Sequence, residues 1–269
     1  MPLAICATPI GNLDDVTLRV LDELRAAERV LCEDTRRTRI LLARHGIEAR
    51  LESYHRHNEA ARTSRVLERL VAGERVALVS DAGLPGVNDP GARLIAEAVA
   101  AGVEVTVLPG ASAVETALVA SGLASDRYQF VGYLPRRAGE LRALAESLAS
   151  WGGTVVAFES PHLLPASLRV LAEVHPGRTA AVCRELTKRF EEVVRGSVEE
   201  LAERFVEPPR GEITVVLGPA EAHGSVQVDA AARAAVADLV AAGTPRKKAA
   251  EVVSQLTGTS RNDLYRDSL

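Results

Sequence analysis

Charged side chains are concentrated in one short stretch, "CEDTRRT", at residues 32–38. Glu33 and Asp34 follow an apolar run and precede a helix-like run, and acidic residues suit the cap and first turn of a helix. The same stretch holds Arg36 and Arg37, whose planar guanidinium groups can grip a phosphate with paired hydrogen bonds. The pattern leaves two interpretations open, a structural cap with surface charge or a site for an anionic group.

A second polar stretch, "SYHRHNE" at residues 53–59, contains two histidines. His55 and His57 lie on the same side if the chain is extended there. A neutral imidazole can act as a base near neutral pH. A structural role for the pair is the alternative, and the sequence alone does not decide between them.

Three loops rich in small residues follow apolar runs: "TPIGNLDD" at 8–15, "SDAGLPGVNDPG" at 80–91 and "LPGASA" at 108–113. Each contains a proline and at least one glycine, and so offers backbone N–H and C=O groups in a fixed shape. Any one of them could be a plain surface connection. Because parallel strands point the same way, we expect the three loops to meet at one edge of a sheet, where ligands bind in open α/β folds.

The sequence argues against several types of ligand at the sheet edge where these three loops meet. It has no GxGxxG dinucleotide fingerprint, no GxxxxGK[ST] phosphate loop and no His/Cys cluster with metal spacing, so we expect no metal. The loops hold one prominent carboxylate, Asp81, and little positive charge. A nucleoside with a cationic or zwitterionic tail fits better than a polyphosphate. Asp81 could bind that tail, or it could only cap its own loop.

Composition points to an ordinary globular protein. The 269 residues are 47% hydrophobic and 25% charged, and the net charge is -4. A protein that coats nucleic acid with its whole surface would be basic, so any such contact here must use a local patch. Three separated cysteines indicate neither a zinc site nor a disulfide framework. The first residues lack a signal-peptide pattern and no apolar run could span a membrane, so we expect a cytoplasmic protein.

Strand-like and helix-like runs alternate through the first part of the chain. We expect strands at 3–8, 29–34, 75–80 and 103–110, and helices at 17–27, 36–46, 61–73 and 91–102. The strands are short and apolar throughout, as in a mostly parallel sheet covered on both faces.

The regular alternation of strands and helices ends after "LPGASA". We expect strands at 128–134, 153–160, 178–186, 190–196 and 212–218, with fewer helices between them and a tight connection within 183–197. This suggests a second α/β domain with a mixed sheet. The tail reads as helices at 227–243 and 244–258 and a short one from 259, with the basic residues Arg246, Lys247, Lys248, Arg261 and Arg266. We therefore divide the chain into domains at 1–113, 114–220 and 221–269.

Several stretches in order carry a family resemblance: "TPIGNLDDVTLR", "CEDTRRTRILLARHGI", "SYHRHNE", "ALVSDAGLPGVNDPG", "LPGASA", "FVGYLPR", "FESPH" and "CRELTKRFEEVVRGS". They resemble the ribosomal RNA small subunit methyltransferase I family, within the tetrapyrrole methylase superfamily of class III S-adenosylmethionine (SAM) methyltransferases. The resemblance covers residues 1–220 and continues into "RKKAAEVVSQLTG" and "RNDLYR". "TPIGNL" together with "EDTRRT" is specific, whereas the "SDAG" loop marks only the superfamily.

The resemblance implies two α/β domains with SAM bound between them as the consumed methyl donor, a small C-terminal helical domain and a homodimer. It also implies methyl transfer to the 2′-oxygen of a cytidine ribose in the decoding region of 16S rRNA, in the 30S subunit. Two positions depart from the family pattern. Ala111 stands where proline is frequent, and Leu163 stands where an arginine is usual. We expect the chemistry to survive both changes, with RNA affinity the property affected by Leu163.

The motif match implies a set of donor-binding residues: Pro9, Gly11, Asp81, Gly83, Leu84, Val87, Gly110, Ser112, Ala113, Glu159, Leu186 and Ile213. A ribose hydroxyl needs a group that accepts its proton. Our candidates for the chemistry are Glu33, Asp34, Arg36, Glu185 and Lys188. Glu185 and Lys188 could form only a surface salt bridge, or a lysine with a lowered pKa could take the proton.

Two other functions remain open at this point. The chain could methylate a small tetrapyrrole precursor, although its basic tail and the arginines of "TRRTR" would then have no purpose. It could also be a non-catalytic module that binds SAM or RNA.

Overall fold

The structure is a computed structural model that describes residues 2–220, 225–257, 259, 261 and 264–265, and side chains within 221–230 are not described. The chain divides into two compact units. The first comprises residues up to 149 and 153–219, and the second comprises 150–152 and the chain from 220 onward. Both α/β halves of the sequence lie in the first unit.

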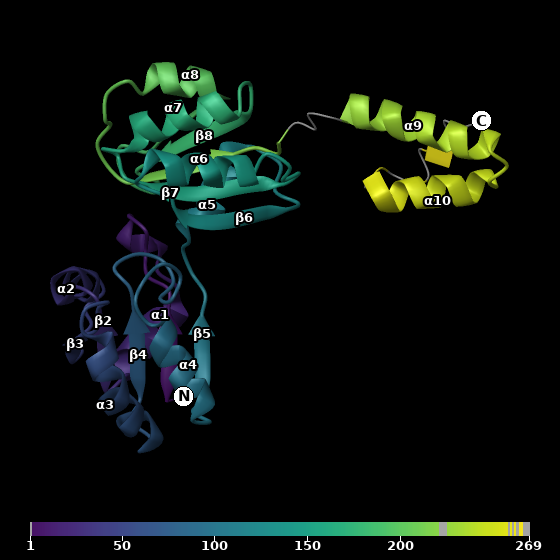
Figure 1. Ribbon diagram of the computed structural model, residues 1–269. Coiled ribbons are helices and arrows are strands. Elements are labelled where there is room, and N and C mark those ends of the chain that lie inside the picture. The colour runs from purple at the N-terminus through teal and green to yellow at the C-terminus, as the bar shows by residue number, and fades with distance from the viewer. Residues whose placement is uncertain (1, 221–224, 258, 260, 262–263, 266–269) are drawn as a thin grey trace. The chain divides into compact units, whose positions relative to one another are not determined.

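The first half is built on a parallel five-stranded sheet in the order β3-β2-β4-β1-β5 (Figure 1). Its strands are β1 (Leu3–Cys6), β2 (Arg29–Cys32), β3 (Leu51–Ser53), β4 (Val76–Val79) and β5 (Val105–Leu108). Every residue of β1, β2 and β4 is buried, which explains why these strands are apolar apart from Arg29, whose buried guanidinium is ion-paired with Glu52 and Glu74.

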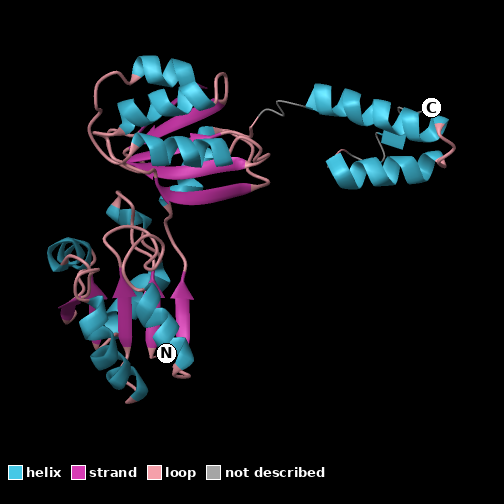
Figure 2. Ribbon diagram, in the orientation of Figure 1, coloured by secondary structure: helices cyan, strands magenta, loops and turns pink. Residues whose placement is uncertain are grey.

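Helices cover both faces of this sheet (Figure 2). They are the α-helices α1 (Leu18–Ala26), α2 (Thr35–Arg44), α3 (Glu59–Val71) and α4 (Ala92–Ala100), while the 3₁₀ helix η1 (Leu13–Asp15) has no buried residue and lies in the loop after β1. Side chains cap two of them, since Thr17 accepts from the N–H of Val20 and Asp34 from the N–H of Arg36. Each cap fixes where its helix starts relative to the preceding chain.

The second half contains a mixed five-stranded sheet in the order β6-β7-β10-β8-β9. Its strands are β6 (Tyr128–Tyr133), β7 (Thr154–Glu159), β8 (Thr179–Arg184), β9 (Glu192–Ser197) and β10 (Ile213–Leu217). β6 pairs with β7 in parallel, and the other pairs are antiparallel. The predicted fold class, an α/β protein with a second mixed sheet and a helical C-terminal part, is confirmed.

Fewer helices lie between the strands of this half, as expected. They are α6 (Ala138–Ser147), α7 (Leu164–Val174) and α8 (Val198–Arg204), whereas α5 (Ala113–Ser121) precedes β6 and no helix separates β8 from β9. The helix α5 starts two residues after Ala111, and its apolar side packs against β8 and β10. Our division of the chain into three domains stays a prediction.

The second unit contains α9 (Ser225–Ala241) and α10 (Arg246–Thr257), which pack on each other. Their shared core consists of Ala232, Val236, Ala249, Ala250, Val253 and Leu264. Arg261, Leu264 and Tyr265 are helical, but most of the short helix expected from residue 259, including Arg266, lies outside the described residues.

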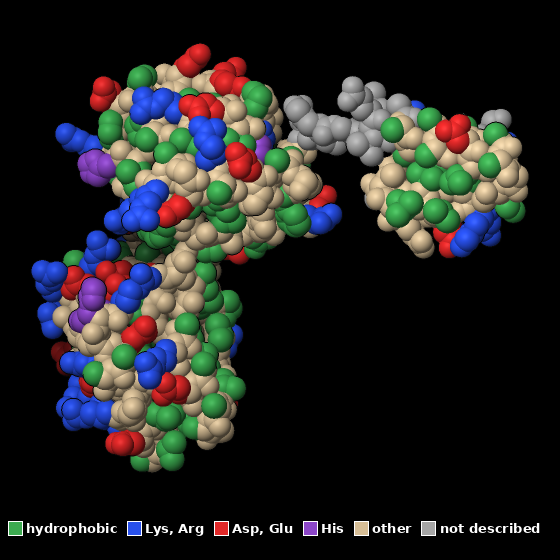
Figure 3. All heavy atoms as spheres, in the orientation of Figure 1, with side chains coloured by type: hydrophobic (Ala, Val, Ile, Leu, Met, Phe, Trp, Pro, Cys, Tyr) green, Lys and Arg blue, Asp and Glu red, His purple; other side chains and the backbone are tan. Residues whose placement is uncertain are grey.

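Basic side chains gather along the side of the first α/β half that carries α2 and α3 (Figure 3). Exposed members of this group are Arg36, Arg37, Arg39, Arg44, Arg56 and Arg65. The chain therefore carries a local basic surface despite its net charge of -4.

Replacing Leu31 in β2 should test how much the first sheet depends on its buried strands. Leu31 is 0% exposed, so Leu31→Ala should lower the free energy of unfolding by about 2–5 kcal/mol because it leaves a cavity. Leu18→Ala is the matched control, since Leu18 is 79% exposed and its loss should cost within about 0.5 kcal/mol. Urea denaturation of the full chain measures both, and equal midpoints for the two variants would contradict the expectation.

Candidate active site

Three loops meet beyond the carboxyl ends of β1, β4 and β5. The N–H of Thr8 donates to the carbonyl of Gly83 at 2.8 Å, and the N–H of Gly83 donates back to Thr8 at 3.0 Å. The Thr8 hydroxyl also donates to the carbonyl of Ser80 at 3.0 Å. A Cβ atom at Gly110 would lie 2.9 Å from that of Ala7, so the third loop packs directly on the first. The predicted convergence of the three loops is confirmed.

A cavity of about 620 Å³ lies between these loops and the second sheet. Most of the predicted donor-binding residues line it: Gly83, Leu84, Val87, Gly110, Ser112, Ala113, Glu159, Leu186 and Ile213. The first six come from the loops after β4 and β5, and the last three from the second half of the chain. This larger cavity is big enough for a nucleoside-sized ligand with a tail.

The charged residues that line the larger cavity are all acidic within the part of the chain that the structure describes. They are Asp89, Glu115, Glu159 and Glu212. The apolar part of the lining includes Phe130, Tyr133 and Phe158, whose rings meet edge to face at centroid distances of 4.9 and 5.5 Å. Such a lining suits an apolar or aromatic ligand with positive charge and disfavours a polyphosphate.

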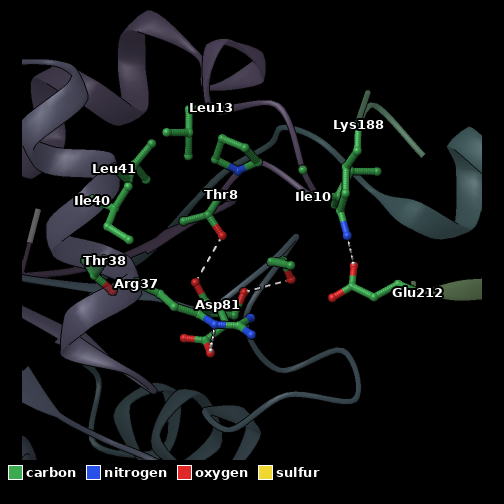
Figure 4. Close-up of a pocket in the computed structure, with 14 residues that line it drawn as sticks. Thr8, Ile10, Leu13, Arg37, Thr38, Ile40, Leu41, Asp81, Lys188 and Glu212 are labelled. Atoms are coloured by element: carbon green, nitrogen blue, oxygen red, sulfur yellow. Dashed lines mark hydrogen bonds and ion pairs between the residues drawn. The ribbon is translucent and has the colours of Figure 1, made fainter. Parts of the chain in front are cut away.

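A smaller cavity of about 290 Å³ lies beside the larger one (Figure 4). The other predicted donor-binding residues, Pro9, Gly11 and Asp81, line this smaller cavity. Ile10, Ala82 and Glu212 line both cavities, so these three residues stand where the two spaces adjoin.

The turn after β8 closes against the loop after β1. The N–H of Asn12 donates to the hydroxyl of Thr187 at 3.0 Å, and a Cβ atom at Gly11 would lie 2.5 Å from Cγ of Lys188. Glu185 and Thr187 both have left-handed backbones, with φ of 52° and 64°. Non-glycine residues hold such conformations only where the surroundings enforce them. The contact with Gly11 and Asn12 supplies part of that enforcement.

Lys188 lines the smaller cavity and is paired with two carboxylates. Its Nζ lies 2.8 Å from Oε1 of Glu185 and 2.9 Å from Oε2 of Glu212. Burial lowers the pKa of Lys188, but the hydrogen bonds to the two carboxylates outweigh burial and raise the pKa overall. Of the two alternatives for Glu185 and Lys188, the structure therefore shows the salt bridge and not a lysine with a lowered pKa.

The side chains of Glu33, Asp34, Arg36 and Glu185 are not among the described residues that line either cavity. Asp34 caps α2, and the side chain and N–H of Arg36 hold the pKa of Asp34 well below its usual range. Burial and the nearby Asp81 carboxylate raise the pKa of Glu33. Of the predicted catalytic group, the structure brings only Lys188 to a cavity.

Asp81 holds a neighbouring loop instead of capping its own. Its Oδ1 accepts from the N–H of Asp34 at 3.0 Å, and its Oδ2 lies 3.6 Å from Nε of Arg37. The loop after β4 is thus tied to the start of α2. Asp81 keeps one oxygen in the smaller cavity, within reach of the exposed guanidinium of Arg37 (Figure 4).

The two histidines form a turn rather than an extended pair. The N–H of His55 donates to the side chain of Asn58 at 2.8 Å, and the His55 ring also contacts the Asn58 amide. The rings of His55 and His57 lie 6.0 Å apart at an interplanar angle of 66°. Asn58 bends the chain here, so the segment is not extended and the condition for that argument about the two histidines is not met.

Sequence reasoning missed three acidic residues of the cavities, Asp89, Glu115 and Glu212. Burial and the nearby Glu33 carboxylate raise the pKa of Asp89 to about 6. Asp89 stands in the "NDPG" stretch, where we considered only turn chemistry. Glu212 starts the run before β10 and meets Lys188 only through folding, so no local pattern could have singled it out.

The described residues contain no group of three or more His, Cys, Asp or Glu side chains that could hold a metal ion. Among the helices that the structure describes, none is both long and apolar enough to cross a membrane.

The model of the tetrapyrrole (corrin/porphyrin) methylase family matches residues 2–202. Two relatives called "Ribosomal RNA small subunit methyltransferase I" align along nearly the whole chain. The protein from Mesorhizobium japonicum is 45% identical over 98% of this chain and 90% of its own. The protein from Micromonospora olivasterospora is 46% identical over 98% of this chain and 85% of its own.

Solved structures support the same fold. A diphthine synthase covers 80% of this chain and 89% of its own, with a TM-score of 0.62 and 18% identity. A uroporphyrin-III-C-methyltransferase from Thermus thermophilus covers 80% and 93%, with a TM-score of 0.55 and 22% identity. At such low sequence identities, the two structures are evidence for the fold only. The match to the family model and the identity shared along almost the whole chain place this protein among the tetrapyrrole methylases, as a member of the ribosomal RNA small subunit methyltransferase I family.

Proposed function

We propose that this chain transfers a methyl group from SAM to the 2′-oxygen of a cytidine ribose in the decoding region of 16S rRNA. The name that its relatives carry supports ribosomal RNA of the small subunit as the substrate. The observation that carries the proposal is the larger cavity, whose described charged residues are all carboxylates and which adjoins a second cavity.

The larger cavity suits SAM for electrostatic reasons. SAM carries a positive sulfonium and a positive ammonium group against a single carboxylate, so acidic walls attract it. The carboxylates of Asp89 and Glu159 are partly or fully buried, so their field is screened less than in bulk water, and the exposed Glu115 adds a third negative charge. The aromatic side chains at Phe130 and Phe158 offer apolar surface to a purine ring. We propose that the residues predicted for donor binding act here.

The loops supply fixed shape for that binding. Thr8 and Gly83 exchange backbone hydrogen bonds, and Gly110 packs against Ala7, so the loop backbones are ordered before any ligand arrives. Preorganised groups lose little entropy on binding. Glu159 is held in the same way, because its carboxylate accepts from the N–H of Ser160 at 2.6 Å and from the Ser167 hydroxyl.

Methyl transfer from SAM requires two things of the protein: it must align the acceptor oxygen with the methyl group, and it must supply a group that accepts the hydroxyl proton. SAM supplies a methyl group already activated by its sulfonium. The protein must hold the acceptor oxygen in line with that methyl group and exclude water. A hydroxyl becomes a competent nucleophile as its proton leaves, so an acceptor must stand next to it.

RNA contact fits the local basic surfaces. Arg36, Arg37 and Arg39 are exposed on α2, beside the smaller cavity. In the second unit, Arg246, Lys247 and Lys248 begin α10. We propose that both groups bind rRNA phosphates.

Leu163 lies at the start of α7 and not in the described lining of either cavity, which fits our expectation that this departure affects RNA affinity only.

We propose further that the chain works as a homodimer in the cytoplasm. β5 is an edge strand, and Val107 on it and Val119 on α5 are exposed. Exposed strand edges with apolar side chains are usually covered. Sedimentation of the full chain at micromolar concentration should give twice the mass of one chain, and a single-chain mass would contradict the dimer.

The test of the function is methyl transfer from labelled SAM. The substrates are 30S subunits from cells that lack this chain and, in parallel, a porphyrinogen. We expect label in one cytidine of 16S rRNA, at a site where the phosphodiester resists alkaline cleavage because the 2′-oxygen is blocked. Label in the macrocycle alone, or none in either substrate, would overturn the proposal.

Binding of SAM should weaken in acid through Asp89. Because the pKa of Asp89 is raised to about 6, this carboxylate is charged above pH 6 and loses its charge as the pH falls. A cationic ligand prefers the charged form, so the Kd for SAM should rise about tenfold between pH 7.5 and pH 5. The charged groups around Asp89 are Glu33, Asp81 and Arg56.

Calorimetry with SAM across this pH range measures the effect. Asp89→Asn should bind more weakly at pH 7.5 and lose most of the pH dependence. Glu115→Gln is the matched control from the same cavity and should keep it. An unchanged pH dependence in Asp89→Asn would show that another group is responsible.

A further inference from the structure

The smaller cavity has two chemically different sides (Figure 4). Leu13, Ile40 and Leu41, from η1 and α2, form an apolar side. The Lys188–Glu212 ion pair lies across the cavity from them (Figure 4), and Arg37 and Asp81 stand along its polar part. A ligand that fits must therefore present a flat or apolar surface on one side and polar groups on the other.

Ile40 is the least expected of these residues. Leu41 and Leu42 of the same helix are buried in the hydrophobic core, whereas Ile40 is 61% exposed and does not pack in the core. A large aliphatic side chain at the mouth of a cavity offers a surface against which an unstacked base can lie. The neighbouring Arg37 is exposed too and is placed for a phosphate.

The size of the smaller cavity limits what it can hold. Its volume of about 290 Å³ is near the lower end of small-molecule cavities, which start at about 300 Å³. One nucleoside fits such a space, whereas a whole tetrapyrrole macrocycle is too large. Enzymes that modify RNA commonly take a single nucleotide out of its stack into a pocket of this kind.

The junction between the cavities identifies the reacting group. A methyl group that passes from the larger cavity to the smaller one must cross beside Ile10, Ala82 and Glu212. Glu212 is the only one of these three with a group that can accept a proton. Lys188, at 2.9 Å, holds the Glu212 carboxylate in place, so Lys188 is a positioning residue.

We propose that the smaller cavity receives one unstacked pyrimidine nucleoside of the RNA, with its base against Leu13 and Ile40 and its 2′-hydroxyl against Glu212. This inference rests on the proposed function. The 2′-oxygen forms a bond to the methyl carbon while the carbon–sulfur bond breaks, and the electron pair of that bond stays on sulfur. The hydroxyl proton passes to the Glu212 carboxylate. The products are the 2′-O-methyl nucleoside and S-adenosylhomocysteine.

Steady-state methylation of 30S subunits at saturating SAM tests the base-binding side. Ile40→Ser should raise KM for the subunit about tenfold with kcat within twofold, because it removes contact with the base. Val99→Ser is the matched control, since Val99 on α4 is also 61% exposed and lies outside both cavities. An unchanged KM in Ile40→Ser would remove the nucleoside from this cavity and overturn the proposal.

The reacting side is tested by Glu212→Gln, which keeps the shape of the side chain. The side chain of Glu212 is 66% exposed, so the fold should not depend on it. We expect kcat to fall by about 10²–10⁴-fold, the usual contribution of a general base, with the calorimetric Kd for SAM within twofold. The matched control is Glu192→Gln, because Glu192 is also ion-paired but lies outside both cavities.

The possible outcomes distinguish a failure of this inference from a failure of the proposed function on which it rests. An unchanged kcat in Glu212→Gln overturns the inference and leaves the function standing. A large rise in the Kd for SAM in that variant would place Glu212 in donor binding and would also overturn it. Absence of transfer by the unaltered chain would overturn the proposed function, and this inference with it.

Discussion

The reciprocal backbone hydrogen bonds between Thr8 and Gly83 are the constraint on which the candidate site depends. They join the loop after β1 to the loop after β4 at 2.8 and 3.0 Å, beyond the ends of the strands themselves. Ile10 and Ala82, on either side of this link, stand between the two cavities. The link therefore fixes the position of the residues that separate the two cavities.

Charge is divided between the two cavities. The described charged residues of the larger cavity are acidic, whereas the smaller one also contains Arg37 and Lys188. Under the proposed function, this division would attract the cationic donor to the larger cavity and the anionic RNA to the smaller one. Glu212 belongs to both linings, and its pairing with Lys188 balances a charge that would otherwise face the RNA. A protein with a net charge of -4 can attract RNA in this way because the attraction is local.

The sequence was sufficient to predict the fold because its strands are continuous apolar runs bounded by small residues. β1, β2 and β4 were predicted for this reason, while β3 escaped because "LES" is short, polar and only half-buried. Motifs led to Gly83, Gly110 and Ile213, which do line the larger cavity.

Tertiary contacts explain what the sequence could not show. The pKa of Lys188 is raised rather than lowered because Glu185, three positions away, and Glu212, 24 positions away, both come within hydrogen-bond distance, and only the first of these contacts is local. The raised pKa of Asp89 likewise depends on burial and on Glu33 from another strand end. No local pattern contains such information.

The left-handed backbone at Thr187 has a consequence for how the two α/β halves stay joined. Glycine at this position would relax the backbone, since it adopts such angles at no steric cost. It would also remove the hydroxyl that accepts the N–H of Asn12. Thr187 thus keeps an unfavourable backbone conformation together with a hydrogen bond between segments that are far apart in the sequence. A glycine there would relieve the backbone but would weaken the contact between the turn after β8 and the loop after β1.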